Sequence, residues 1–236
     1  MSEGLAFERA PGIPSAAYKD ASTIIIVPER DPMFHFRWIQ HFMGMIGPMN
    51  QKRHIMFVIG EEVGHAYTDT IKQILANAEL SKWKYILTVE SDNLVPADAH
   101  IRLLESIEEC KLDAVGGLYW TKGDLNQPMA YGDAQKYAST GVLDFAPIDV
   151  RAAMQKSAVV EVNGLGMGCT LFRMELFKQL DPPWFVTVND VVPGQGVKLY
   201  TQDLYFFEKA RRTGKRFGCD TRVRVGHMDL KSGTVY

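Results

Sequence analysis

Strand-like and helix-like stretches alternate along the first half of the chain. Short runs rich in β-branched and other apolar residues lie at 22–27, 54–59, 85–89 and 113–119. Stretches of helical length separate them, at 34–46, at 67–79 and in about 14 residues that begin with Pro96 at the first helical position. The alternation predicts a parallel sheet with helices on both faces. Runs without polar alternation indicate strands that are buried on both sides.

The second half of the chain is less regular and predicts a mixed architecture. Residues 158–162 and 217–227 read as strands, and 202–214 read as a helix that ends at Gly214. Residues 189–197 read as a flexible loop. We expect residues 1–20 to form an N-terminal arm and residues 21–236 to form one α/β domain, because no linker-like segment interrupts them.

Composition excludes several classes of protein. The 236 residues are 46% hydrophobic and 23% charged with a net charge of -2, so the chain as a whole is not built to bind a polyanion. Three cysteines without a CxxC spacing argue against a disulfide framework or a structural zinc site and fit a reducing compartment. No signal-like segment and no run of about 18 apolar residues occurs, so we expect a cytoplasmic protein without a membrane span.

Polar loops follow three of the predicted parallel strands. They are residues 28–31 (PERD), 60–64 (GEEVG) and 90–93 (ESDN). Because ligands of such sheets bind outside the carboxyl ends of the strands, we expect these loops to share one crevice. Glu90 and Asp92 allow two interpretations at this point: a turn in which Asp92 or Asn93 caps the next helix, or a site for a divalent metal ion.

Five motifs occur in a characteristic order along the chain. They are ESDNLVP at 90–96, GLGMGCTLFR at 164–173, PWF at 183–185, QD at 202–203 and VGH at 225–227. In this order and spacing the chain resembles the GT-A glycosyltransferases of the family-2 type over roughly residues 22–228. The resemblance implies a Rossmann-like, mostly parallel sheet flanked by helices with a mixed second half.

The resemblance also implies a metal site and a nucleotide site. A Mn²⁺ or Mg²⁺ ion would be held by Glu90, Asp92 and His227. Glu90 stands where the family usually has Asp, and contact with the ribose or with a metal-bound water is the alternative role for it. Such an ion stabilises the negative charge that develops on a departing diphosphate. The residues that the resemblance assigns to the nucleotide are Pro28, Glu29, Arg30, Glu61, Glu90, Ser91 and Asp92.

The remaining site residues come from the second half of the chain. The resemblance implies that Asp203 is the general base for an acceptor hydroxyl if the enzyme inverts configuration, although helix capping by Asp203 is an alternative. Gln202 replaces the Glu that usually precedes this Asp, so its contact with the acceptor is open. The GLGMG stretch is expected to let the backbone approach the donor sugar or the acceptor. Further candidates for acceptor or sugar contacts, which core packing would equally explain, are Trp120, Tyr131, Gly166 and Trp184.

One basic stretch allows two readings. Residues 209–224 hold seven Lys and Arg and one acid, Asp220. They form either a solvated helix end or a patch for an anionic acceptor. We favour the solvated helix end.

The sequence therefore predicts a metal-dependent glycosyltransferase that moves a sugar from a nucleotide-diphospho-sugar, UDP-linked, to an acceptor hydroxyl. The acceptor class is open among glycans, lipids, proteins and modified nucleic acids. One alternative is a nucleotidyltransferase, for which residues 29–32 (ERDP) offer a poor triphosphate loop. Another is a degenerate member that binds a sugar or nucleotide without turnover.

Overall fold

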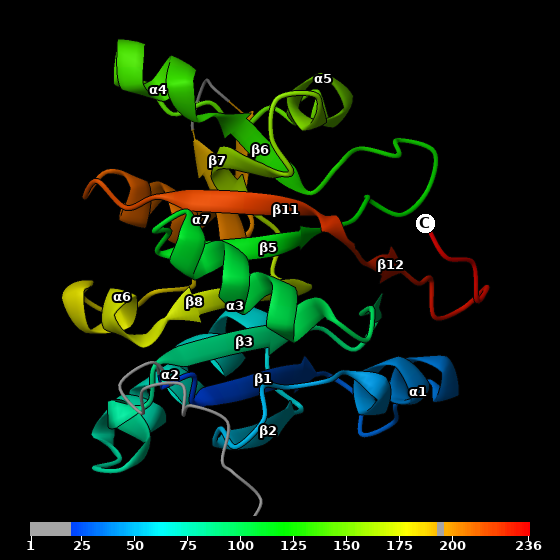
Figure 1. Cartoon of the computed structure of the whole chain (residues 1–236). Helices are drawn as coiled ribbons and strands as arrows, with labels where there is room; N and C mark the ends of the chain where they lie inside the picture. Colours follow the sequence, from blue (N-terminus) through cyan, green and yellow to red (C-terminus); the bar gives the residue numbers. More distant parts are fainter. Residues whose placement is uncertain (1–19, 193–195) are drawn as a thin grey trace, which may run out of the picture.

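A computed structural model describes residues 20–192 and 196–236, so the predicted N-terminal arm lies almost wholly outside the described residues (Figure 1). An eight-stranded sheet forms the centre of the molecule, in the order β2-β1-β3-β8-β5-β11-β7-β6. Its strands are β1 (Thr23–Glu29), β2 (Arg53–Ile59), β3 (Tyr85–Val89), β5 (Ala114–Leu118), β6 (Ala130–Asp133), β7 (Val159–Leu165), β8 (Cys169–Arg173) and β11 (Phe217–Arg224).

Six of these eight strands point the same way. β1 runs parallel to β2 and β3, and β5 runs parallel to β11. β8 is antiparallel to both β3 and β5, and β7 is antiparallel to both β11 and β6. The mostly parallel α/β sheet with a mixed second half is therefore confirmed. The strands at 85–89 and 113–119 do not pair directly, however, because β8 lies between them.

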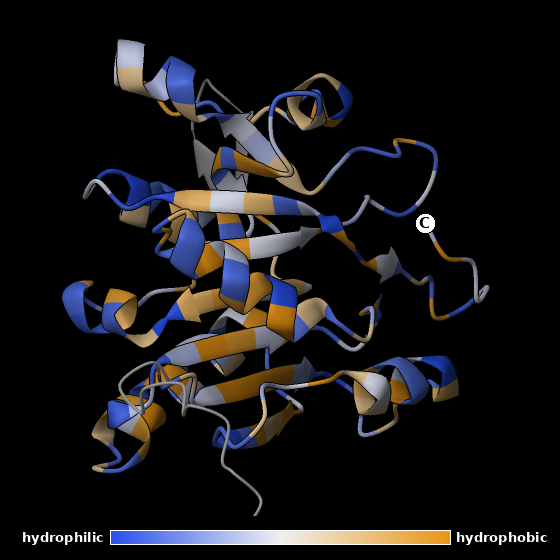
Figure 2. Cartoon of the chain, viewed as in Figure 1, coloured by the Kyte–Doolittle hydropathy of each residue, from blue (hydrophilic) through white to orange (hydrophobic). Residues whose placement is uncertain are grey.

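Helices cover both faces of the sheet and bury its alternating side chains. On one face, Ile24, Ile26 and Ile86 pack with α2 (Val63–Ala76), α6 (Met174–Gln179) and α7 (Gln202–Arg211). On the other face, Ile25 and Leu87 pack with α1 (Phe36–Gly44) and α3 (Ala99–Glu109). In Figure 1, α3 crosses the near side of the sheet and α2 lies behind it. Figure 2 shows apolar residues concentrated in the central strands, which are buried on both sides.

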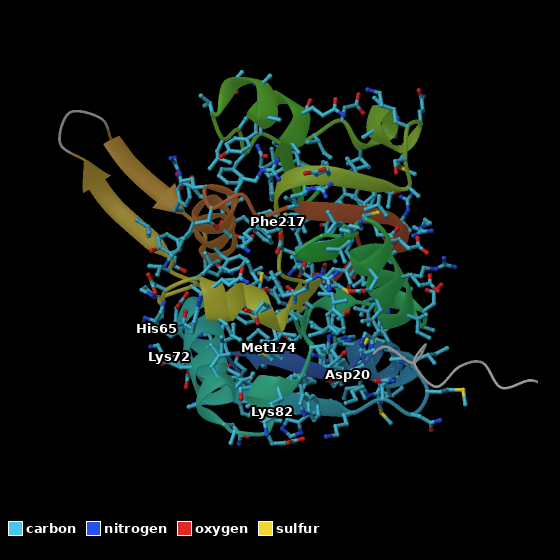
Figure 3. The ribbon with its side chains drawn as sticks, turned by 60° about the vertical axis from the view of Figure 1, so that its left-hand side comes forward. Asp20, His65, Lys72, Lys82, Met174 and Phe217 are labelled. Atoms are coloured by element: carbon cyan, nitrogen blue, oxygen red, sulfur yellow. The ribbon has the colours of Figure 1, made fainter. Side chains whose placement is uncertain are left out.

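Smaller elements complete the described chain. Two short helices, α4 (Ala134–Thr140) and α5 (Val150–Met154), follow β6, and a 3-10 helix spans Leu80–Lys82. β4 (Asn93–Leu94) pairs with β12 (Gly226–His227), and β9 (Val188–Val192) pairs with β10 (Gly196–Tyr200). Figure 3 shows β9 and β10 extending from the body as a two-stranded arm.

Three local predictions were wrong. The segment 189–197 contributes to antiparallel strands β9 and β10, although residues 193–195 fall outside the described part. Pro28 does not end the first strand, because it pairs with Val58 while the pairing of β1 with β3 already ends at Ile26. Pro96 does not open a helix, since α3 begins at Ala99 after the cap residue Asp98.

Among the described residues, no helix combines the length and the apolar character needed to cross a membrane.

Candidate functional site

A cleft of about 560 Å³ lies at the carboxyl ends of β1, β2 and β3. Its lining includes all seven residues that the sequence assigned to the nucleotide: Pro28, Glu29, Arg30, Glu61, Glu90, Ser91 and Asp92. Gly60, Glu62 and Val63 complete it. The arrowheads of β1, β5 and β11 point to this end of the molecule, where α1 and β12 also lie (Figure 1). The three polar loops thus meet in one crevice, as a parallel arrangement requires.

Asp92 contacts two basic side chains. The ammonium of Lys122 donates a hydrogen bond to Asp92 Oδ2, and His227 Nε2 lies 3.5 Å from the same oxygen. Burial opposes ionisation of Asp92, but His227 and Lys122 outweigh that effect and hold its pKa below the usual range. Asp92 is therefore an ionised carboxylate, the form that binds a cation.

The β4–β12 pairing carries His227 to Asp92. His227 pairs with Asn93 across these two short strands, although the two residues are far apart in the sequence. Its Nδ1 lies 2.7 Å from the Trp120 carbonyl oxygen. Because a carbonyl only accepts, Nδ1 carries a proton, and Nε2 is the ring atom that faces Asp92. A backbone anchor of this kind is typical of metal-ligating histidines.

Glu90 is partly buried, and its protonation differs from that of Asp92. Its carboxylate accepts a hydrogen bond from Tyr67 at 3.4 Å, and its backbone carbonyl accepts from Trp38 Nε1 at 2.9 Å. Burial, followed by the negative charges of Asp92 and Asp203, raises the pKa of Glu90 to about 8. A protonated carboxyl group can donate a hydrogen bond, so Glu90 suits contact with a ribose or water better than direct ligation of a metal.

The metal-ligand chemistry of the site rests on two side chains. Within residues 20–192 and 196–236, no three His, Cys, Asp or Glu side chains converge as a metal-binding cluster. Asp92 and His227 would nevertheless supply one carboxylate and one imidazole to a divalent ion, and phosphate oxygens and water would have to provide its other ligands. Lys122 at present neutralises the carboxylate that such an ion would use.

The alternative role of Asp92 and Asn93 as a helix cap does not apply. The cap position of α3 is Asp98, several residues further on. The Asn93 side chain is buried, and neither its amide nitrogen nor its oxygen has a hydrogen-bond partner among residues 20–192 and 196–236. Asn93 and Leu94 form the β4 strand instead, and Asp92 lies in the turn before it.

Asp203 lies in the first turn of α7, as the sequence predicted, and only 6% of it is exposed. Its Oδ1 accepts from the Leu204 amide at 2.8 Å. Burial raises its pKa, and hydrogen bonds from Thr201 and Leu204 offset that effect only in part. Because the charge of Asp203 also acts on Glu90, the fold brings the candidate base to the same region as the cleft residues.

Glu62 was missed by sequence reasoning, which assigned its exposed neighbour Glu61. Glu62 caps α2 by accepting from the His65 amide at 3.0 Å, and it accepts from Thr187 Oγ1 at 2.8 Å. Its position before a helical stretch was a capping signal in the sequence. Lys122 and Tyr67 were also missed, and no local pattern marks either one.

A second hollow of about 640 Å³ shares Glu62 with the cleft. It lies between the outer side of α2 and residues 183–187. Figure 3 labels two of its lining residues on α2, His65 and Lys72. Gln202 lies nearby, since its Cβ would be 3.4 Å from a Cβ added at Gly64.

The predicted acceptor residues divide into two groups. Trp184 is buried in the core, where its ring nitrogen donates to the Leu180 carbonyl at 2.7 Å, so it offers no face for a sugar. Gly166 is also buried by packing, because an added Cβ would lie 2.1 Å from the Tyr119 hydroxyl. Trp120 and Tyr131 remain partly accessible.

The GLGMG glycines serve internal packing. A Cβ at Gly168 would lie 2.4 Å from the Asn93 side chain, and the Gly168 amide donates to the Tyr119 hydroxyl at 2.9 Å. The close approach expected for this stretch is therefore to the protein's own side chains.

The basic stretch near the end of the chain is paired internally. Arg211 is buried and contacts Glu161 at 3.4 Å and the Tyr137 ring at 4.9 Å. Arg216 also contacts Glu161, at 2.9 Å, and Arg222 contacts Asp220 at 2.9 Å. These contacts disperse the charge and disfavour a dedicated anion patch.

Comparison with known proteins supports the fold. No family model matches the chain, and no curated protein matches it in sequence. The crystal structure of A197 from STIV superposes with a TM-score of 0.59 and 16% identity over 88% of this chain and 86% of that chain. The crystal structure of GalNAc-T7 with UDP, GalNAc and Mn²⁺ gives a TM-score of 0.55 and 11% identity, and the match covers 89% of this chain and 44% of that chain. This chain has a GT-A-like fold.

Proposed function

We propose that this protein is a metal-dependent glycosyltransferase that uses a nucleotide-diphospho-sugar, UDP-linked, and transfers the sugar to an acceptor hydroxyl. One observation carries the proposal: the cleft at the strand ends collects all seven sequence-assigned nucleotide residues and has Asp92 at its edge beside His227. UDP, GalNAc and Mn²⁺ in the GalNAc-T7 structure support this class of donor and ion.

In this proposal, the nucleotide-sugar donor binds in the cleft and its diphosphate lies toward Asp92. Asp92 and His227 would hold the divalent ion, which would supply positive charge to the departing diphosphate. The protonated carboxyl of Glu90 donates a hydrogen bond to the ribose or to a water at the site. Glu61 and Glu62 border the cleft at the start of α2, where they accept from the N–H groups of the base.

Asp203 acts as the general base in an inverting reaction. The acceptor hydroxyl oxygen forms the new bond to the anomeric carbon, the bond to the diphosphate breaks, and the hydroxyl proton passes to the Asp203 carboxylate. Burial raises the pKa of Asp203 and so makes its carboxylate a better proton acceptor. Trp120, Tyr131 and Gln202 are the candidates for contact with the acceptor, whose class is open.

Release of free nucleotide diphosphate from a panel of nucleotide sugars tests the reaction. We expect one donor to be turned over in the presence of Mn²⁺. Asp203→Asn should retain donor binding but lower transfer by roughly 100-fold or more, because general-base catalysis is lost. Asp133→Asn, which alters an exposed cap residue of α4, is the matched control. A variant at Asp203 that transfers normally would exclude this base.

A second candidate is a degenerate protein that binds a sugar or nucleotide without turnover. The contact of Lys122 with Asp92 favours it, because a fixed ammonium can replace a metal ion as the partner of the carboxylate. Tight donor binding without Mn²⁺ and without nucleotide release would support this candidate over the enzyme.

A further inference from the structure

The connection between β5 and β6 contacts both proposed metal ligands. Lys122, which lies on this connection, donates a hydrogen bond from its ammonium to Asp92 Oδ2. Trp120, two residues earlier, accepts a hydrogen bond at its carbonyl oxygen from His227 Nδ1 at 2.7 Å. The same connection therefore brings an ammonium to Asp92, at the edge of the cleft, and anchors the neighbouring imidazole.

The backbone of this connection is held in place, while the Lys122 side chain reaches solvent. The Thr121 amide donates to the Gln127 carbonyl at 2.8 Å, and the Gln127 amide donates to Thr121 Oγ1 at 3.0 Å. Trp120 also forms a β-bridge with Pro128. The Lys122 side chain is 32% exposed. Because a lysine has a flexible four-carbon stem, its ammonium can change partner without movement of this backbone.

The cleft beside Lys122 is acidic. Among the described residues, its lining has one base, Arg30, and five acids, which are Glu29, Glu61, Glu62, Glu90 and Asp92. Burial and the charges of Asp92 and Asp203 raise the pKa of Glu90 to about 8, so Glu90 is mainly protonated at neutral pH and the other four acids outnumber the base. A diphosphate carries several negative charges, and it therefore needs positive charge besides Arg30 to bind in this cleft.

A divalent ion on Asp92 would displace Lys122 from its present partner. The ion and the ammonium would repel each other, because charges a few ångström apart in a partly buried site are screened only weakly. Asp229 also experiences the charge of Lys122, but its Oδ1 already accepts from two backbone amides. In the proposed function, a phosphate oxygen beside the ion offers the displaced ammonium a strong, charge-assisted hydrogen bond.

We propose that Lys122 binds the diphosphate of the donor: it pairs with Asp92 in the nucleotide-free protein and with a phosphate oxygen when the nucleotide and the ion are bound. This role rests on the proposed function and adds a donor-binding residue to it. The exchange couples the two ligands, because a nucleotide that takes Lys122 from Asp92 leaves this carboxylate to the ion. By the same reciprocity, an ion on Asp92 releases Lys122 to the nucleotide and raises the affinity for it.

Titration calorimetry of UDP with the full chain tests this role, at a Mn²⁺ concentration that saturates the ion site. Lys122→Met should lower the affinity for UDP by about tenfold, because a charge-assisted hydrogen bond to phosphate is lost. Uridine, which has no phosphate, should bind Lys122→Met and the unchanged protein equally. Lys122→Arg keeps the charge and should retain most of the affinity for UDP. If Lys122 only competed with the ion, its removal would leave UDP binding equal or tighter.

Lys136→Met is the matched control, because it removes an exposed lysine that pairs with Asp144, and it should bind UDP like the unchanged protein. Equal or tighter UDP binding by Lys122→Met would overturn the role of Lys122 and leave the proposed function standing. Absence of UDP binding by the unchanged protein would contradict the proposed function, and the role of Lys122 with it. If Lys122→Met fails to fold, which circular dichroism checks, Lys122→Gln tests the same loss of charge.

Discussion

Lys122 forms an ion pair with Asp92, one of the two proposed metal ligands. Its side chain is 32% exposed and that of Asp92 is 22% exposed, so solvent screens their contact only in part. An ammonium on Asp92 competes with any divalent ion for the same oxygen. In the proposed function, the strength of this competition decides how readily Asp92 accepts a metal ion before the nucleotide binds.

Lys122→Met removes the charge and keeps the aliphatic length. We expect Mn²⁺ to bind the nucleotide-free variant about tenfold more tightly, since Asp92 no longer has a competing partner. Titration calorimetry measures this affinity directly. Lys136→Met, which breaks an exposed pair with Asp144, should leave it unchanged. Equal or weaker Mn²⁺ binding by Lys122→Met would show that Lys122 does not compete with the ion.

Glu90 makes the stability of the metal-free protein depend on pH. Its pKa is raised from 4.5 to about 8 on folding, so its protonated form stabilises the folded state at low pH. That contribution is fully present below the unfolded pKa and is lost as the pH rises through the folded pKa. Wild-type stability should therefore fall between about pH 5 and pH 9.

Glu90→Gln is neutral at every pH and should remove this fall. The expected gain over wild type at the alkaline end is on the order of a few kcal/mol. Urea unfolding across the pH range measures it. Glu79→Gln, at an exposed carboxylate whose pKa is lowered, should keep the wild-type slope. An unchanged slope in Glu90→Gln would mean that Glu90 is ionised in the folded protein.

At the scale of elements, the strands of the first half were predictable because a continuous apolar run indicates a buried strand from the local sequence alone. The runs at 22–27, 54–59 and 85–89 became β1, β2 and β3 in parallel register. The strands β9 and β10 were missed because the segment between their ends is rich in Gly, Pro and Asn, which indicates a loop. The start of α3 was shifted because Pro96 precedes a turn before the helix.

The glycine-rich connection from β7 to β8 depends on small residues for packing. Gly166→Ala should lower the free energy of unfolding by roughly 2 kcal/mol, because its Cβ would collide with the Tyr119 ring and hydroxyl. Gly44→Ala in α1 meets no atom within 4 Å and should be neutral or slightly stabilising. Urea unfolding compares the two variants. A Gly166→Ala protein as stable as Gly44→Ala would show that the Tyr119 contact relaxes without cost.

At the scale of the whole molecule, the site depends on contacts that join distant parts of the chain. Sequence motifs identified Asp92, His227 and Asp203 separately, and β4–β12 pairing and the position of α7 bring them to one region. Lys122 and Tyr67 could not be found from sequence, because their roles depend only on tertiary placement. Trp184 shows the opposite case. Its motif suggested a contact with the sugar or the acceptor, but the folded chain buries it in the core.

The most direct measurement is the thermal stability of the full chain with a panel of nucleotide sugars, in the presence and absence of Mn²⁺. We expect one UDP-linked donor to raise the melting temperature only when Mn²⁺ is present, because binding to the folded state stabilises it. Asp92→Asn should abolish that shift, whereas Asp98→Asn at the cap of α3 should keep it. A donor shift that is equally large without Mn²⁺, or one that survives Asp92→Asn, would contradict a metal-dependent nucleotide-sugar site at Asp92.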